Sequence, residues 1–232
     1  MEHPLVRDLL KLADKKKAAF FPTFFKTGKG QYGEGDVFIG VTVPQTRLVA
    51  KKYKELSLKE IGRLLKDKRH EVRLCVLLIL GDQFKRGDES TRKIIYGFYL
   101  DHLKWVNNWD LVDSSASHIV GTYLLDKDRK ILRKMAKSKH LWTERVAMVS
   151  TMAFIRKGEL KDTFEIAEML LPHQHDLMHK AAGWMLREAG KKNVVALKRW
   201  LDENAVVMPR TMLRYAIEKF DEKERKRYLL MK

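Results

Sequence analysis

The chain has 232 residues and is strongly basic: 47 Lys and Arg against 30 Asp and Glu give a formal net charge of +17. Hydrophobic residues make up 45%, enough for a sizeable core, and 13 Gly with 5 Pro are few for a β-sandwich or a loop-rich protein. The single cysteine, Cys75, excludes an intramolecular disulfide and, inside an apolar run, is expected to be a buried thiol. The excess of positive charge favours a polyanionic partner, of which nucleic acid is the commonest.

Neither membrane insertion nor secretion is predicted. The apolar run 76–80 is far shorter than the roughly 20 residues that a membrane-spanning helix needs. Residues 1–4 lack the cationic and apolar regions of a signal peptide. We therefore expect a cytoplasmic protein with no membrane partner.

Residues 1–42 form a region of their own, in which we expect N-terminal helices and a glycine-rich loop. The segment 20–25 is aromatic and interrupted by a proline, and the loop 28–36 follows it. This loop lacks the Gly-Lys-Ser/Thr ending of a phosphate-binding loop, and no strand is predicted before it. We interpret it as a structured loop that lies near the ligand.

From Val43 onward the pattern is helical, and residues 43–232 are expected to form helical pairs. Apolar residues recur at three- and four-residue intervals, which is the periodicity of an amphipathic helix. Polar turns that contain a glycine interrupt the pattern at 85–88, 157–159 and 190–193. Because no segment alternates convincingly with period two, we expect no significant sheet.

Four sites share a cation, a small residue two positions later and an apolar helix that follows. They are Arg73, Arg145, Lys180 and Arg214. The spacings are 35 residues (145 to 180), 34 (180 to 214) and 72 (73 to 145), the last being two units of 36. Such spacing is close to that of helical-pair repeats. We therefore predict an all-α fold, a right-handed α-solenoid of HEAT-like (ARM-type) helical-pair repeats, in a single domain over residues 1–232.

Asp113 occupies the missing position of this series, so a carboxylate stands where a cation is expected. It follows Trp109 by four residues, which on a helix places both side chains on one face, one turn apart. Trp184 follows Lys180 with the same spacing. A cation near a helix N-terminus opposes the helix dipole, so the repeated cations call for a reason. For each cation, two roles remain open: contact with a DNA phosphate, and a salt bridge to the neighbouring repeat. The set as a whole favours contact with phosphates.

Other chemistry-bearing residues have simpler interpretations. His175 and His179 have the i, i+4 spacing of metal ligands, with His173 nearby, but no glutamate directly follows His175 as it does in zinc proteases. We expect solvated histidines at a helix start and no metal site. Ser114 and Ser115 lack the Gly-x-Ser-x-Gly motif of a nucleophilic serine and are expected to cap or pack.

Three motifs, in order along the chain, resemble the HEAT-like-repeat alkylpurine DNA glycosylases of the DNA alkylation repair family. They are Trp-Asp-Leu-Val-Asp at 109–113, Leu-Trp-Thr-Glu-Arg-Val-Ala at 141–147 and Lys-Ala-Ala-Gly-Trp-Met-Leu-Arg-Glu at 180–188. The segment 38–44 also resembles the start of that family's first helix. The motifs are specific in combination, and together they cover most of the chain.

The resemblance implies a basic concave face that holds double-stranded DNA containing alkylated bases, and hydrolysis of the N-glycosidic bond of N3- and N7-alkylated purines such as 3-methyladenine and 7-methylguanine. It implies a catalytic carboxylate at Asp113, indoles of Trp109 and Trp184 against the backbone of the lesion, and a phosphate contact from Arg145. Such enzymes do not need to flip the base into a pocket. Further DNA-binding cations are expected at Arg73, Lys180, Arg187 and Arg214. We also expect a monomer.

The chemistry of such a lesion fits these residues. An alkylated purine of this kind already carries a positive charge and leaves as a neutral base, so no general acid is required. The sugar becomes an oxocarbenium-like cation, which a carboxylate at Asp113 would stabilise while it aligns water. Indole faces at Trp109 and Trp184 would add cation–π attraction of about 0.5–2 kcal/mol each. We expect neither a metal nor a cofactor to take part.

Two other functions remain open on the sequence. A non-catalytic HEAT-like protein that recognises damaged or branched DNA would need the basic face but not Asp113. A protein–protein scaffold is the usual function of HEAT-like arrays, but it would leave both the net charge and Asp113 unexplained.

Overall fold

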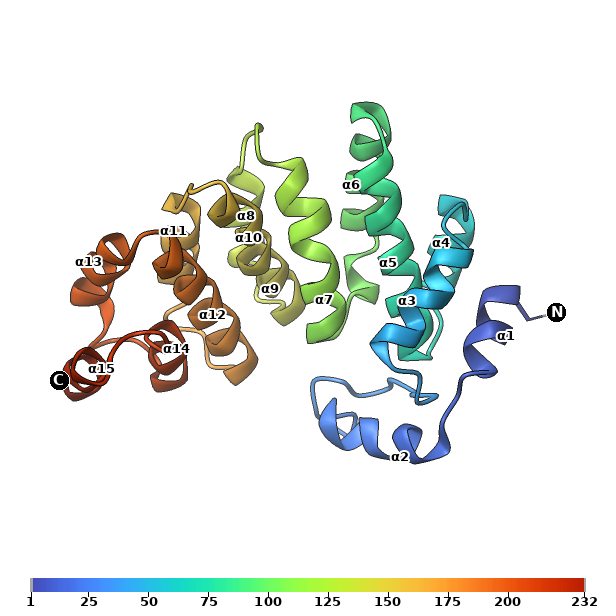
Figure 1. Ribbon diagram of the computed structural model, residues 1–232, viewed down its shortest axis with the longest axis horizontal. Helices are drawn as coiled ribbons and strands as arrows, with labels where there is room; N and C mark the ends of the chain where they lie inside the picture. The colour runs from blue at the N-terminus through green and yellow to red at the C-terminus, as the bar shows by residue number, and fades with distance from the viewer. Residues whose placement is uncertain (1, 232) are drawn as a thin grey trace. The chain divides into compact units, whose positions relative to one another are not determined.

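The computed structural model describes residues 2–231, and the protein is helical along that range (Figure 1). A single β-bridge joins Val37 to Arg69, and no strand occurs among the described residues. The predicted all-α fold is confirmed. Backbone contacts divide the chain into two compact units, residues 1–115 (unit 1) and 116–232 (unit 2), and each is described by itself.

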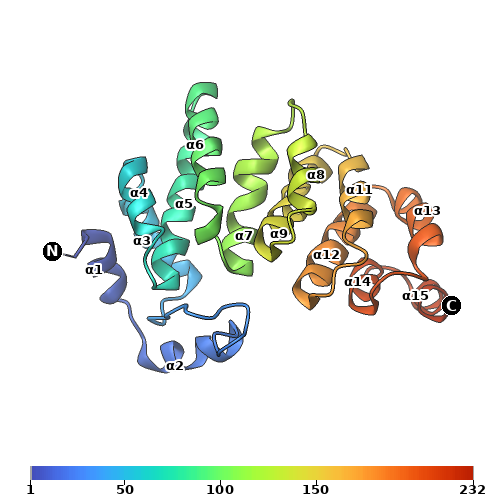
Figure 2. The same cartoon turned by 180° about the vertical axis from the view of Figure 1, so that it is seen from behind.

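Unit 1 is built around α5, the long helix His70–Arg86. Its other helices are α1 (Pro4–Leu10), α2 (Lys15–Phe24), α3 (Val43–Lys52), α4 (Leu58–Leu64), α6 (Glu89–Asp101), a 3-10 turn (Leu103–Trp105) and α7 (Trp109–Ala116). Helices α1, α3, α4 and α6 all pack on α5, which lies between α3 and α6 in both views (Figures 1 and 2). Eleven residues of α5 are buried, so this helix forms the core of the unit.

Cys75 lies in the buried part of α5, as predicted. Burial raises the pKa of its thiol to about 12. The thiol therefore stays protonated at neutral pH, and Cys75 acts as a small apolar core residue.

The loop 28–36 is structured, as predicted, because its own side chains satisfy its backbone. Gln31 accepts a hydrogen bond from the Gly28 N–H (2.9 Å), and Glu34 accepts one from the Gly30 N–H (2.7 Å). A Cβ on Gly33 would lie 2.5 Å from the carbonyl oxygen of Phe25, so only glycine fits there. The loop leads into α3, which begins at Val43 as predicted, behind a capping box of Thr42 and Gln45.

Unit 2 has α12 (Asp176–Lys192) at its centre. Its other elements are a π-helical turn (Ser117–Gly121), α8 (Lys130–Ala136), α9 (Leu141–Ser150), α10 (Met152–Arg156), α11 (Lys161–Met169), α13 (Val194–Asn204), α14 (Arg210–Ala216) and α15 (Glu222–Leu230). Helix α14 makes the most extensive contact with α12. A Cβ on Gly183 would lie 2.5 Å from the Met212 carbonyl oxygen, so this glycine permits the close approach of α12 and α14.

Each of the three predicted turns contains the end of a helix, but in the third the helix ends at its C-cap, Asn193, and not at the glycine. Helix α5 ends at Arg86, and α10 ends at Arg156 before Gly158, which has a φ of +82°. Gly190, however, lies inside α12, which continues to Lys192. The side chain of Leu197 on α13 packs directly over Gly190, so this glycine serves helix packing rather than helix termination.

The repeat positions correspond to one place in successive helices. Asp113, Arg145, Lys180 and Arg214 are each the fifth residue of their helices, α7, α9, α12 and α14, and Arg73 is the fourth residue of α5. These residues therefore lie about one turn inside each helix and not at its first residue. The cost of opposing the helix dipole is smaller there, because that effect falls off within the first turn.

Candidate active site and nucleic-acid interface

Trp109 and Asp113 lie one turn apart on α7, as their spacing predicts. The Trp109 ring stacks on Phe25 with centroids 5.2 Å apart and meets Phe24 edge-on at 5.8 Å. The Asp113 side chain is half-buried. Aromatic contacts thus fix the indole, and Asp113 one turn further on is a partly exposed residue.

The two serines after Asp113 have packing roles. Ser114 and Ser115 both donate to the Leu111 carbonyl, at 3.2 and 2.6 Å. The buried Ser115 hydroxyl therefore accepts a hydrogen bond from Tyr99 (2.8 Å). Burial, together with the nearby Asp113 carboxylate, raises the pKa of Tyr99. Among residues 2–231, no base contacts either hydroxyl as a nucleophilic serine requires.

A buried cluster of charged residues, absent from the sequence predictions, holds the start of α7. His70 bonds to Asp36 through Nδ1 (3.0 Å) and to Asp110 through Nε2 (2.8 Å). The Asp36 carboxylate also accepts hydrogen bonds from Arg73 (2.5 Å) and Asn108 (3.2 Å). Burial lowers the pKa of His70, but the adjacent Asp110 and Asp36 outweigh it and raise that pKa to about 9. A charged imidazole therefore ties the end of the glycine-rich loop to the first turn of α7.

The sequence does contain a signal for this cluster. His70, Glu71 and Arg73 place charge at the start of a helix whose next residues, 74–80, are all apolar, and buried charges require partners. The Glu71 carboxylate accepts hydrogen bonds from the backbone N–H groups of Ile39, Gly40 and Val41, at 2.8 to 3.3 Å. It thereby fixes the chain just before α3.

The structure buries Arg73, for which a DNA contact was predicted. Its side chain is only 3% exposed, and its guanidinium pairs with Asp36. It also donates to the carbonyl oxygens of Asp67 (2.8 Å) and Lys68 (3.2 Å). Arg73 therefore compensates a buried carboxylate and is not available to a phosphate.

An apolar recess of about 390 Å³ lies beside Trp109 in unit 1. We call it the aromatic recess, and it is lined by Phe20, Phe21, Phe24, Phe25, Phe38, Val41, Thr42, Val43, Pro44, His70, Glu71, Leu74, Trp109 and Asp110. Helix α2 supplies most of the phenylalanines, the first turn of α3 supplies one edge, and α7 supplies the tryptophan. The structure thus places a ligand-sized hollow against an indole that was predicted to meet the lesion.

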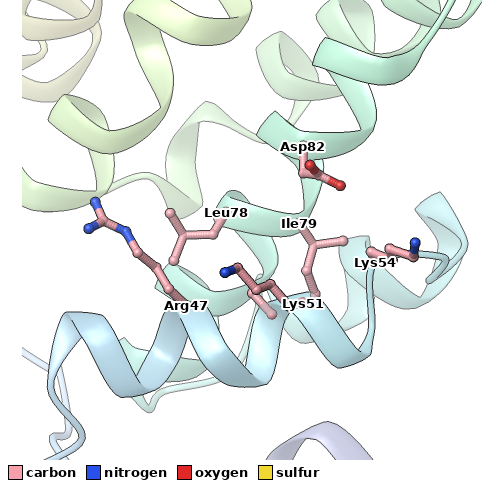
Figure 3. A pocket seen from close by; sticks show the side chains of 7 residues that line it. Arg47, Lys51, Lys54, Leu78, Ile79 and Asp82 are labelled. Carbon is pink, nitrogen blue, oxygen red and sulfur yellow. The ribbon is translucent and has the colours of Figure 1, made fainter.

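A second hollow of about 460 Å³ lies between α3 and α5 and carries three cations (Figure 3). We call Arg47, Lys51 and Lys54 the cationic row; Arg47 and Lys51 lie one turn apart on α3, and Lys54 lies in the turn that follows this helix. All three are exposed, and none pairs with a carboxylate among the described residues. The one acid beside them, Asp82, pairs with Arg86 (2.9 Å). The sequence pattern did not predict this row, because its members lie outside the repeat positions.

In unit 2, α12 presents a partly exposed face on which Lys180, Trp184 and Arg187 follow at i, i+4 and i+7. Lys180 lies 2.8 Å from Asp176 on the same helix, and Arg187 pairs with Glu218 of the segment after α14. Arg214 on α14 is exposed, with no carboxylate partner among the described residues. These predicted residues lie in unit 2, whereas Trp109 and Asp113 lie in unit 1.

Arg145 is buried within unit 2. Its side chain is 4% exposed, and its guanidinium donates to the Leu177 carbonyl at 2.6 Å. This bond links α9 to the first turn of α12, so one function of Arg145 is to hold these two helices together.

The histidines before and within α12 have partners in the protein. His173 lies 3.0 Å from Glu144, and the His175 ring caps the helix by accepting from the Leu177 N–H (3.1 Å). The His179 ring contacts the His173 carbonyl at 2.5 Å. These contacts give the three histidines structural roles at the start of α12.

The fold and the sequence both match known proteins. A solved structure described as a predicted DNA alkylation repair enzyme from Enterococcus faecalis has the same all-helical fold, with a TM-score of 0.70 at 15% identity over 90% of this chain and 97% of that one. The model of the DNA alkylation repair enzyme family matches residues 5–220, so the chain belongs to this family. The comparison with curated proteins found no match.

Family membership supports a role in DNA alkylation repair and confirms the family resemblance. Within the part of the chain that the structure describes, no helix is long and apolar enough to cross a membrane.

Proposed function

We propose that this protein is a monofunctional DNA glycosylase that hydrolyses the N-glycosidic bond of cationic N3- and N7-alkylated purines in duplex DNA. The observation that carries the proposal is the pair on α7: a partly exposed carboxylate, Asp113, one turn from the indole of Trp109. The pair occurs in a DNA alkylation repair chain whose net charge is +17. Its framework is a monomeric, right-handed α-solenoid of HEAT-like repeats.

The proposed reaction needs little beyond electrostatics. The alkylated base is already positively charged, so its departure as a neutral base leaves the bonding electron pair on the base and the positive charge on the sugar. The Asp113 carboxylate stabilises this oxocarbenium-like sugar and orients the water that attacks it. Trp109 supplies an aromatic face for the same cation. For Arg145 to contact a phosphate, its guanidinium must exchange the hydrogen bond to the Leu177 carbonyl for one to the phosphate.

Binding of the duplex is assigned to cations whose exposure permits it. These are the cationic row together with Lys180, Arg187 and Arg214. Lys180 and Arg187 already face carboxylates, so they would exchange these partners for phosphate. Neutralising phosphates releases counterions, which makes the binding dependent on salt.

The test of the proposal is release of free 7-methylguanine or 3-methyladenine from methylated duplex DNA. Asp113→Asn keeps the size of the side chain and removes its charge, and we expect base release to slow by at least about 100-fold. Duplex affinity should stay within a factor of two or so, because Asp113 does not bind phosphate. Release at the native rate by Asp113→Asn would disprove the catalytic role.

A non-catalytic DNA-binding function is the second candidate, and the cationic row favours it because that row needs no Asp113. It predicts salt-dependent duplex binding with no base release under any condition. A protein–protein scaffold would instead show no salt-dependent affinity for DNA.

A further inference from the structure

Another hollow, of about 660 Å³, lies between the N-terminal segment with α1 and the end of α4. Both helices pack on α5 in unit 1. We call it the basic hollow, and the residues that line it come from the segments 2–7 and 63–69. None of them lines the aromatic recess or the hollow of the cationic row, so the basic hollow is a separate place on this unit.

Three cations that line the basic hollow have no acidic partner. Arg7 belongs to α1, Arg63 belongs to α4, and Lys66 follows α4 in the chain. All three are exposed, and none forms an ion pair with a carboxylate among residues 2–231. Their charges are therefore open to a ligand.

The two acids that line the basic hollow are both committed to a fourth cation, Arg69. Its guanidinium lies 2.6 Å from the carboxylate of Glu2 and 2.7 Å from that of Asp67, and its Nε donates a further hydrogen bond to Asp67 (2.9 Å). Four cations against two carboxylates leave the lining a net charge of +2. The acids thus do not neutralise the three unpaired cations.

The helix dipole accounts for only part of this arrangement. Arg7 and Arg63 lie in the last turns of α1 and α4, where a cation is favoured. This explains each arginine on its own helix, but not why three unpaired cations from two elements line one hollow, since like charges repel. Val6 and Leu64, which are 1% and 5% exposed, add apolar surface to the lining. A hollow with low-dielectric walls and charge of one sign concentrates anions.

We propose that the basic hollow is a phosphate-binding site. The unpaired guanidinium groups of Arg7 and Arg63 are planar forks that fit phosphate oxygens in pairs, and Lys66 adds a point charge. The volume of about 660 Å³ is that of an ordinary ligand site. The proposal does not depend on the glycosylase reaction, because neither Trp109 nor Asp113 lines this hollow.

A phosphate group at this place has two sources, the backbone of DNA and a free nucleotide, and the fold favours DNA. Arg69 lines the basic hollow, and the next residue, His70, lines the aromatic recess beside Trp109. Adjacent residues have Cα atoms about 3.8 Å apart, so the two hollows adjoin at the start of α5. The backbone of a duplex that contacts α7 would therefore pass close to these cations.

Calorimetric titration of the full-length protein with inorganic pyrophosphate tests the site directly. We expect the native protein to bind it, and the triple variant Arg7→Gln, Arg63→Gln and Lys66→Gln to bind it at least about tenfold more weakly. The matched control removes the same charge from lysines that pair with acids outside the hollow. It replaces Lys130, Lys161 and Lys226 by glutamine, and its affinity should stay within about twofold of the native value.

The double variant Arg7→Lys and Arg63→Lys separates a built site from general attraction. It keeps every charge and removes both guanidinium forks, so we expect pyrophosphate to bind about three- to tenfold more weakly. Because both side chains are exposed, circular dichroism should show an unchanged fold. Native affinity in this variant would mean that the cations only attract anions diffusely, and would overturn the site.

A duplex arm identifies the source of the phosphate. If the site binds DNA, the glutamine triple should flatten the slope of log affinity against log salt by up to about 2.7, at about 0.9 for each lost contact. If only pyrophosphate binding is lost and the duplex slope keeps its native value, the site takes free nucleotides.

Absence of pyrophosphate binding to the native protein, or equal losses in the two triple variants, would overturn the proposal. Base release from methylated duplex is measured separately. A native protein that releases base but binds no pyrophosphate would keep the glycosylase and lose this site, and the reverse result would keep the site and lose the glycosylase.

Discussion

At the scale of single residues, the same side chain type has different roles at equivalent places. Arg73 and Arg214 occupy nearly the same position in α5 and α14, yet Arg73 is buried against Asp36 and Arg214 is exposed. The difference comes from the neighbours. Loop 28–36 brings a carboxylate to Arg73, and no described residue does so for Arg214.

Arg73→Met should therefore destabilise the protein strongly. It leaves Asp36 buried with one cation fewer, and breaking a buried pair by removing one partner costs about 3–5 kcal/mol. Chemical denaturation of the variant would show this as a lower free energy of unfolding. Arg214→Met, at the exposed position, should change that free energy by less than about 0.5 kcal/mol. Similar small effects of both substitutions would refute the structural role given to Arg73.

At the scale of elements, α7 is held in place from its first turn. Asn108 accepts from the Trp109 N–H (2.8 Å) and donates to Asp36, while Asp110 bonds to His70. The helix that carries the proposed catalytic pair is thereby joined to α5 and to the glycine-rich loop. Its orientation depends on an imidazole that carries a charge.

This dependence predicts a loss of stability at alkaline pH. The pKa of His70 is raised from 6.5 to about 9 in the folded protein, so its stabilisation is fully present below pH 6.5 and is lost as the pH rises through 9. We expect the free energy of unfolding to fall by about 3 kcal/mol over this range, as an order of magnitude.

Denaturant titrations between pH 6 and 10 would measure this fall. His70→Gln should be less stable at pH 6 and should lack this component of the pH dependence. His140→Gln, at an exposed histidine, should retain it. A pH dependence that is identical in His70→Gln and the native protein would exclude His70 as its source.

At the scale of the whole molecule, positive charge is abundant but only part of it is available to DNA. Many lysines and arginines are paired with acids, such as Arg129 and Arg133, which both bind Asp162. The cationic row stands apart because its members are exposed and have no described acidic partner. Net charge therefore overstates the number of phosphate contacts.

Replacing Arg47, Lys51 and Lys54 together by glutamine should weaken duplex binding and its salt dependence. Each lost phosphate contact removes about 0.9 from the slope of log affinity against log salt, so the slope should flatten by up to about 2.7. Fluorescence anisotropy over a range of salt concentrations measures this. The control triple substitution takes lysines that pair with acids, Lys130, Lys161 and Lys226. A slope changed equally by both triples would mean that the row is not a specific contact.

The sequence by itself determined the features that depend on local periodicity. Apolar spacing predicted an all-α chain, the start of α3 at Val43 and the buried Cys75. The repeated pattern correctly placed Asp113, Arg145, Lys180 and Arg214 at one position in their helices. These succeed because a helix sets its side-chain directions from the backbone alone, over a few residues.

Tertiary structure decided which of these side chains could meet a ligand. Whether Arg73 is exposed depends on Asp36, and the aromatic recess exists only where α2, α3, α5 and α7 converge. Such contacts join residues far apart in the chain, and no periodic pattern encodes them. The physical reason is burial: a charge removed from water must find a partner wherever the fold supplies one, and that partner then determines its role.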